Sequence, residues 1–240
     1  MRKPLLLAAT AVATAVMLTA GSTVAWAATP PARKLGVLTY KKVKGAKVPT
    51  GAFLSAGLKP KTDFTLTFGN SVTIAVTCTQ ATFKTKVTKN PASPGSAVTT
   101  ATSLSVPAAD CTGWNSQVPG VALTVTSLTF KLPAGQAAFS DAKGLPVIVA
   151  APAKSNPAIE ISLSVTAASP IGAFSCSWAA AKLSATYSNT GPLLTIGSQA
   201  ISSPLPQQSP DWCPPVTVSQ IQFGPVNDTS VHGSPHVYVN

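Results

Sequence analysis

The sequence has few of the side chains that act as acids, bases or nucleophiles in enzymes. Its 240 residues include only six Asp and Glu and two His. Acid–base and nucleophilic catalysis generally require a positioned base beside a nucleophile or an acid. The Gly-x-Ser-x-Gly, His-Glu-x-x-His and Gly-rich phosphate-binding motifs are also absent. We therefore expect a non-catalytic protein that uses no cofactor.

Charged residues are scarce, and so are helical patterns. Charged side chains make up 10% of the chain, and no long segment shows the apolar spacing of a helix beside charged faces. Val, Thr and Ser abound among 22 Pro and 16 Gly, a composition that favours strands and turns. The clearest strand covers residues 159–166, where strict alternation places Glu160 on the solvent side. These runs predict an all-β protein, an immunoglobulin-like or related β-sandwich.

Residues 81–88 show the same alternation with lysines on one face. Phe83, Thr85 and Val87 fall on one side of the expected strand, and Lys84 and Lys86 fall on the other. Lysine on an outward face discourages edge-to-edge association of strands. We expect Lys84 and Lys86 to face solvent.

Two β units are expected, because the stretch 64–111 has a weaker copy at 161–213. Each copy holds an alternating run, a cysteine, a second run, an asparagine-containing turn and a closing cysteine. The first cysteines, Cys78 and Cys176, match only if small gaps are placed on both sides of them. The predicted organisation is a basic segment at 28–62, one β unit at 63–150 and a second at 151–240. The sequence leaves open whether the two units share one core.

Long hydrophobic runs are limited to the N-terminus. Met1-Arg2-Lys3 is a positive region, residues 5–18 are apolar, and Ala25-Trp26-Ala27 fits the small-x-small rule for signal cleavage. Gly21-Ser22-Thr23 interrupts the run before it reaches the roughly 20 residues of a membrane span. We predict a signal peptide at 1–27, secretion to the cell envelope or the extracellular space, and no transmembrane anchor after cleavage.

The chain has only four cysteines, which in an exported protein favours two disulfides. Three connectivities are possible. The spacing favours Cys78 with Cys111 and Cys176 with Cys213, which close loops of about 34 and 38 residues. No two cysteines have the two-to-four-residue spacing of a structural zinc site, so we expect no metal.

Acids are absent between the signal peptide and Asp63, whereas basic residues are concentrated there. This positive field is expected to attract an anionic cell-wall polymer. A solvated arm or edge without a partner, which keeps a weakly charged protein soluble, is the alternative. Nucleic acid is disfavoured as a specific partner, because only Tyr40 and Phe53 interleave with the lysines. The candidate ligand-binding residues, in a hairpin or loop after a strand at 35–40, are Lys41, Lys42, Lys44 and Lys47.

Two other classes of protein stay open. A secreted protease inhibitor would use residues 203–215 as a rigid loop held by Cys213. An envelope hydrolase would require Asp110 and Asp211 to converge, although acids beside cysteines are more typical of turns that cap backbone donors. Trp114, Trp178 and Trp212 are expected to pack near the disulfides rather than to form a carbohydrate platform; they too lie close to cysteines in the sequence.

The C-terminal segment contains an acid and two histidines spaced four apart, Asp228, His232 and His236. On a helix these three would share one face and suggest a metal site. Gly233 and Pro235 argue against that helix. We therefore expect a flexible, solvated tail.

Several turn and cysteine motifs carry a resemblance. Cys78, the segment Lys89-Asn90-Pro91-Ala92-Ser93-Pro94-Gly95, Asp110-Cys111-Thr112-Gly113, Cys176 and Tyr187-Ser188-Asn189-Thr190-Gly191 resemble small, uncharacterised exported proteins of actinobacteria. The similarity covers most of the chain from about Phe64 onward. It implies a fold and a cell type, and it carries over no functional residues.

Overall fold

The computed structural model describes residues 34–68, 74–115, 123–132, 135–150, 159–167, 172–201, 203–204, 213 and 215–240. These residues belong to one compact unit, Lys34–Asn240. All strand pairs are antiparallel, and a single turn of 3-10 helix, η1 (Ala108–Asp110), is the one helical element among the described residues. The signal peptide expected at 1–27 lies outside them.

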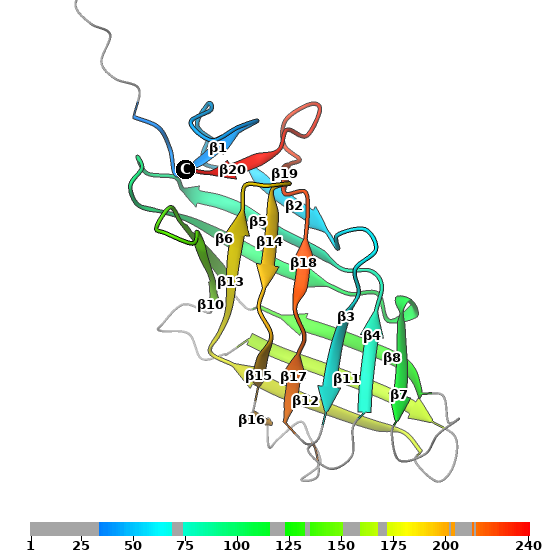
Figure 1. Cartoon of the computed structure of the whole chain (residues 1–240). Helices are drawn as coiled ribbons and strands as arrows, with labels where there is room; N and C mark the ends of the chain where they lie inside the picture. The colour runs from blue at the N-terminus through cyan, green and yellow to red at the C-terminus, as the bar shows by residue number, and fades with distance from the viewer. Residues whose placement is uncertain are drawn as a thin grey trace, which may run out of the picture. The chain divides into compact units, whose positions relative to one another are not determined.

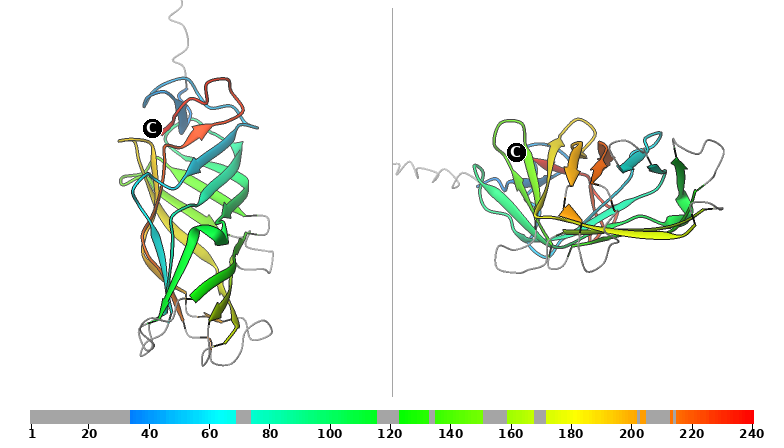
Figure 2. Two further views of the ribbon diagram at one scale, coloured as in Figure 1. Left: turned by 90° about the vertical axis from the view of Figure 1, so that its right-hand side faces the viewer. Right: turned by 90° about the horizontal axis from the view of Figure 1, so that it is seen from below.

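Most strands form two sheets, which lie in two layers in Figure 1 and in the right-hand view of Figure 2. Sheet I has the order β10–β13–β14/β15–β18/β17–β3–β4–β7, in which β14/β15 and β18/β17 are each two short strands in succession. Its strands are β10 (Pro146–Ala150), β13 (Lys182–Ser188), β14 (Leu193–Ile196), β15 (Gln199–Ile201), β18 (Ile221–Phe223), β17 (Val216–Val218), β3 (Phe64–Phe68), β4 (Ile74–Cys78) and β7 (Cys111–Asn115).

Sheet II has the order β19–β2–β5–β6–β9/β8–β11–β12–β16. Its strands are β19 (Asn227–Asp228), β2 (Phe53–Gly57), β5 (Thr82–Lys89), β6 (Ser96–Ser105), β9 (Gln136–Ser140), β8 (Leu123–Lys131), β11 (Ile159–Ala167), β12 (Phe174–Ala180) and β16 (Ser203–Pro204). The two sheets are joined where β10 pairs with β9 and where β7 pairs with β8. A short ribbon of β1 (Leu38–Tyr40) and β20 (Val237–Val239), here called the cap ribbon, lies at one end of both sheets (Figure 1).

The same pairing pattern occurs twice along the chain. In the first half, β2–β9, the groups β2–β5–β6 and β3–β4–β7 form; in the second half, β10–β18, the groups β10–β13–β14 and β11–β12–β16 form. Each sheet combines one group from each half. The predicted boundary at residue 150 falls at the end of β10, and each sheet contains strands from both sides of it.

The register shows which residues correspond in the two halves. Phe64 lies opposite Cys78, and Ile161 lies opposite Trp178. With Phe64 matched to Ile161, Trp178 therefore occupies the place of Cys78, and Cys176 lies two residues earlier. With this match no gap is needed between Cys78 and β5 or between Trp178 and β13, whereas a match of Cys78 with Cys176 needs one.

Alternating strands bury their apolar faces in one cluster that draws on both halves. In β11, Ile159, Ile161, Leu163 and Val165 are all buried. Trp178 of the second half is fully buried, and its ring lies 4.9 Å from that of Phe68 in the first half. The expected core position of Trp178 is thus confirmed; Trp212 and the side chain of Trp114 lie outside the described part.

The predicted class, an all-β sandwich stabilised by disulfides, is confirmed. Both expected bonds are present. Cys78–Cys111 joins directly opposite residues of β4 and β7, with Cα atoms 4.1 Å apart. Cys176–Cys213 joins β12 of sheet II to the segment just before β17 of sheet I, with Cα atoms 5.8 Å apart. The second bond therefore connects the two sheets.

Candidate anionic-ligand site

The four candidate lysines lie in one loop directly after β1. Lys41, Lys42, Lys44 and Lys47 are all exposed in this loop, residues 41–47, which we call the basic loop. The loop is a closed turn: the Tyr40 N–H donates to the Ala46 carbonyl at 2.8 Å, and the Val48 N–H donates to the Leu38 carbonyl at 3.0 Å. The strand expected at 35–40 is present as β1, which positions the loop at the end of the sandwich (Figure 1).

Other basic residues of the predicted N-terminal segment do not join the loop. Lys59 follows β2, and its Nζ lies 3.2 Å from the side-chain oxygen of Gln222 in β18. Arg33 lies outside the described residues. The segment is also not a solvated arm, since β1 and β2 belong to the fold and Leu38 and Leu54 are buried.

The backbone of the basic loop adopts an unusual conformation at two lysines. Lys41 and Lys44 have φ angles of 64° and 60°, in the left-handed region that side chains with a Cβ rarely adopt. Hydrogen bonds hold both residues: the Lys41 N–H donates to the His236 carbonyl at 2.9 Å, and the Lys44 N–H donates to the Asn240 side-chain oxygen at 2.5 Å. Fixed lysine positions lower the ordering cost of binding a ligand.

Exchange of Lys44 for asparagine is expected to separate stability from binding. Asparagine tolerates the left-handed conformation better than lysine, so the free energy of unfolding should stay unchanged or rise by up to about 1 kcal/mol. Binding to an anionic polymer should weaken, because one exposed charge is lost. Urea denaturation and polymer binding measure the two effects.

Lys42→Asn is the matched control, since it removes the same charge from the same loop at a residue outside the left-handed region. Binding should fall as in Lys44→Asn, without any gain in stability. A clear loss of stability in Lys44→Asn but not in Lys42→Asn would contradict the strain assigned to Lys44.

Two asparagines, the buried Asn90 and the half-buried Asn189, hold the cap ribbon beneath the basic loop. The Asn90 side chain accepts from the Leu38 N–H at 2.9 Å and donates to the carbonyls of Leu38 and Val48, both at 2.8 Å. The Asn189 side chain accepts from the Val239 N–H at 2.9 Å and donates to the Val239 carbonyl at 2.6 Å. Leu38 and Val239 are opposite partners in the ribbon, so each asparagine takes the place of a neighbouring strand.

These asparagines occupy corresponding turns, after β5 in the first half and after β13 in the second. Both turns are apparent in the sequence, where they indicate no more than breaks between strands. Their sequence signal is an asparagine directly after the last residue of a strand. That signal alone does not name the strand to which the side chain bonds.

A buried acid provides the second anchor of the loop. Asp228 is fully buried in β19; it accepts from the Tyr40 hydroxyl at 2.5 Å, from the Ser230 N–H at 2.8 Å and from the Ser230 hydroxyl. Burial, together with the Asp228 carboxylate, raises the pKa of Tyr40 above its ordinary value, so the hydroxyl keeps its proton and donates at neutral pH.

The expectation of a flexible, solvated tail at 228–236 is therefore wrong at its start, because Asp228 has become an internal acceptor. His232 and His236 stay exposed, and His236 Nδ1 lies 2.6 Å from the Asn227 side-chain oxygen. Across the described ranges, no group of three His, Cys, Asp or Glu is placed to hold a metal ion.

A surface cavity of about 480 Å³ lies beside the basic loop. It is lined by Lys41 and by residues 231–236, including both histidines. None of the residues that line it is acidic. Its chemistry therefore suits a negatively charged group that Lys41 could pair with.

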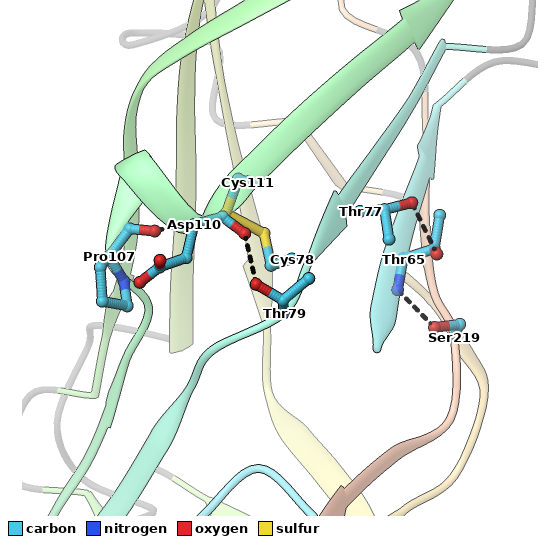
Figure 3. The surroundings of a disulfide bond; sticks show 8 residues. All are labelled: Thr65, Thr77, Cys78, Thr79, Pro107, Asp110, Cys111 and Ser219. Carbon is cyan, nitrogen blue, oxygen red and sulfur yellow. Dashed lines mark hydrogen bonds between the residues drawn. A yellow bond between two sulfur atoms is a disulfide. The ribbon is translucent and has the colours of Figure 1, made fainter. Parts of the chain in front are cut away.

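Of the residues considered for a hydrolase or a protease inhibitor, only some lie in the described part of the chain. Asp110 ends η1 just before Cys111, and its backbone carbonyl accepts from the Thr79 N–H at 3.0 Å and from the Thr79 hydroxyl at 3.3 Å (Figure 3). Asp110 thus lies in a turn, and the oxygen that accepts from Thr79 is its backbone carbonyl rather than its carboxylate. Asp211 and most of the expected inhibitor loop at 203–215 lie outside the described residues.

Comparison with known proteins gives no relative from which a function could be transferred. No protein-family model matches the chain, and neither a curated protein nor a solved structure matches it. Among the described residues, no helix is both long enough and apolar enough to cross a membrane. A functional assignment must therefore come from the geometry of the site.

Proposed function

We propose that this protein is an exported, non-catalytic binding protein of the cell envelope that attaches to anionic polymers through the basic loop. The observation that carries the proposal is the fixed display of four exposed lysines on a closed turn. Lys41, Lys42, Lys44 and Lys47 lie within seven residues, and the turn is anchored from below by Asn90, Asp228 and the cap ribbon.

The charge balance around the loop supports the proposal. Within the described residues the single salt bridge joins Lys131 and Glu160, whose Nζ and Oε2 atoms are 3.8 Å apart. Asp228 lies near the loop but is fully buried and bonded to Tyr40 and Ser230. The loop lysines are thus left to act on an external anion, and the field of such a cluster attracts polyanions.

The compartment in the proposal rests on two features. Two disulfides and no free cysteine among the described residues are typical of proteins in oxidising compartments. The N-terminal sequence has the charge, apolar run and cleavage site of a signal peptide. An envelope location would bring the lysines close to phosphate-rich wall polymers.

The proposal is tested by exchanging all four loop lysines for glutamine and measuring co-sedimentation with isolated Gram-positive cell walls. Each lysine near an anionic surface contributes about 1 kcal/mol, so the variant should lose well over tenfold in affinity. Wild-type binding should weaken at high salt, because exposed charges are screened beyond about 10 Å at 0.1 M ionic strength. A deletion of residues 29–61 is less suitable, since it removes β1 and β2.

The matched control exchanges four exposed lysines elsewhere for glutamine: Lys61, Lys89, Lys143 and Lys182. It has the same net charge as the loop variant and should keep most of the wall binding. Equal losses in both variants would show that net charge, and not the basic loop, drives attachment. Wall binding that persists in the loop variant and does not change with salt concentration would contradict the proposal.

A further inference from the structure

A second concave surface lies on the outer face of sheet II. This groove has a volume of about 540 Å³, and its outward-facing lining consists of Phe53, Ser55, Lys84, Lys86, Ser103 and Thr229. The residues come from β2, β5, β6 and the segment after β19. The buried residues Leu54 and Thr85 belong to its floor. No acid lines the groove.

Strand register brings an aromatic ring, two ammonium groups and hydroxyls together. Phe53 lies opposite Lys86 on the neighbouring strand, and Ser55 lies opposite Lys84. Lys84 lies opposite Ser103 on the next strand. Side chains of directly opposite residues are close enough to act on one ligand.

Phe53 is exposed to an extent that its strand does not require. Its side chain is 51% exposed, and Lys86 Nζ lies 5.1 Å from the centroid of the ring. The negative face of an aromatic ring attracts such a cation. The ring is therefore held in place while much of its surface stays open to a ligand.

The second half of the molecule shows what the fold itself demands at these positions. By register, Pro146 opposite Thr186 corresponds to Phe53 opposite Lys86, and Ile148 opposite Ser184 corresponds to Ser55 opposite Lys84. The second half thus builds the same strands without an aromatic ring or a lysine at the four positions. The residues of the groove are not needed for strand pairing, which points to a role in binding.

We propose that this groove binds an anionic glycan. The C–H face of a sugar ring packs on the exposed part of Phe53, because its weakly positive hydrogens complement the negative face of the aromatic ring. A carboxylate or phosphate on the sugar pairs with Lys84 and Lys86. Sugar hydroxyls bond with Ser55, Ser103 and Thr229. The basic loop takes no part, so the inference stands independently of the proposed wall attachment.

The groove fits a glycan better than a single-stranded nucleic acid. Single-strand binding surfaces stack successive bases on successive aromatic side chains. The outward-facing lining of this groove contains one aromatic residue, Phe53, and three hydroxyl side chains, those of Ser55, Ser103 and Thr229. One platform with several hydroxyl partners matches one sugar ring and its substituents.

The test uses calorimetric titration of the variant in which the four loop lysines are already glutamine, so that loop binding does not contribute. The probes are trigalacturonate, neutral maltotriose and inorganic tripolyphosphate, which carries charge without a ring. Trigalacturonate should bind more tightly than either of the others. Phe53→Ala and Lys84→Gln should each weaken it at least about fivefold, and Phe53→Trp should preserve binding.

Ile148→Ala and Ser184→Ala are the matched controls, because they alter the corresponding exposed surface of the second half. They should leave the affinity unchanged. Since Phe53 is half exposed, Phe53→Ala should keep the wild-type unfolding temperature within a few degrees.

Three outcomes would overturn the inference. One is an absence of trigalacturonate binding. Another is equal affinity for tripolyphosphate with no effect of Phe53→Ala, which would reduce the groove to a charged surface. The third is tighter binding of an oligothymidylate that depends on the same residues, which would identify a nucleic-acid surface. None of these outcomes bears on wall attachment, which is measured with the groove intact.

Discussion

Exchange of Asn90 for alanine is expected to lower the free energy of unfolding by about 3 kcal/mol. The change removes three hydrogen bonds and leaves the N–H and carbonyl of Leu38 and the carbonyl of Val48 without their partner. Each buried polar group left unpaired costs about 1 kcal/mol or more. Asn90 is only 4% exposed, so water cannot readily replace the lost bonds.

Urea denaturation of the purified protein measures this loss. Asn189→Ala, which removes two hydrogen bonds from the other strand of the cap ribbon, should cost about 2 kcal/mol. Thr88→Ala is the surface control: its exposed hydroxyl donates to the Val98 carbonyl at 3.0 Å, and its loss should change stability by about 0.5 kcal/mol at most. An Asn90→Ala effect no larger than that of Thr88→Ala would contradict the role assigned to the Asn90 hydrogen bonds.

The hydrogen bonds of Asn90 also link the stability of the fold to the binding of the ligand. The basic loop begins where β1 ends, and Asn90 bonds to residues on both sides of it, Leu38 and Val48. Asn90→Ala should therefore loosen the four lysines without changing their charge. We expect wall binding to weaken in this variant under conditions where the protein is still folded.

Removal of the Cys78–Cys111 disulfide by a double exchange to alanine is expected to cost about 3–4 kcal/mol. The bond closes a loop with a sequence separation of 33, and a cross-link of that length restricts the unfolded chain by about this amount in the chain-entropy model. Both cysteines are buried, at 0% and 8% exposure, so alanine avoids placing a hydroxyl in the core.

The matched comparison is the double exchange of Cys176 and Cys213, which opens a loop of separation 37. Loop length predicts nearly equal losses for the two bonds. Denaturation of all three proteins, with and without a reductant, separates the bond from the side-chain exchange. Each variant keeps one disulfide, so a reductant should destabilise the wild type, which has both bonds, by more than it destabilises either variant. An equal effect of the reductant on all three would contradict the assignment.

Much of the local structure could be predicted from alternation alone. The pattern at 81–88 predicted which side of β5 is buried: Phe83, Thr85 and Val87 are inside, whereas Lys84 and Lys86 face outward. The pairing of the four cysteines followed from their spacing. Both features depend on neighbours within one strand or on a short loop, where the chain itself limits the possibilities.

The match between the two halves could be predicted only where strands alternate. When Phe64 is aligned with Ile161 at the start of the two copies, the register brings Cys78 into line with Trp178 and not with Cys176. A cysteine is conspicuous in a sequence, yet its place in a repeat is set by the residue opposite it across the hairpin. That residue is known only when the strands are paired.

The sequence by itself determined the all-β class, the faces of individual strands, the two disulfides and the position of the lysine-rich loop. The tertiary structure decided what those parts face. It combined strands of both halves in each sheet, directed Asn90 and Asn189 at the two strands of the cap ribbon, and buried Asp228 under Tyr40. It also aligned Phe53 with Lys86 and Ser55 with Lys84 in one groove. The physical reason is that alternation is local, whereas the partner across a strand is chosen by long-range packing of the whole core.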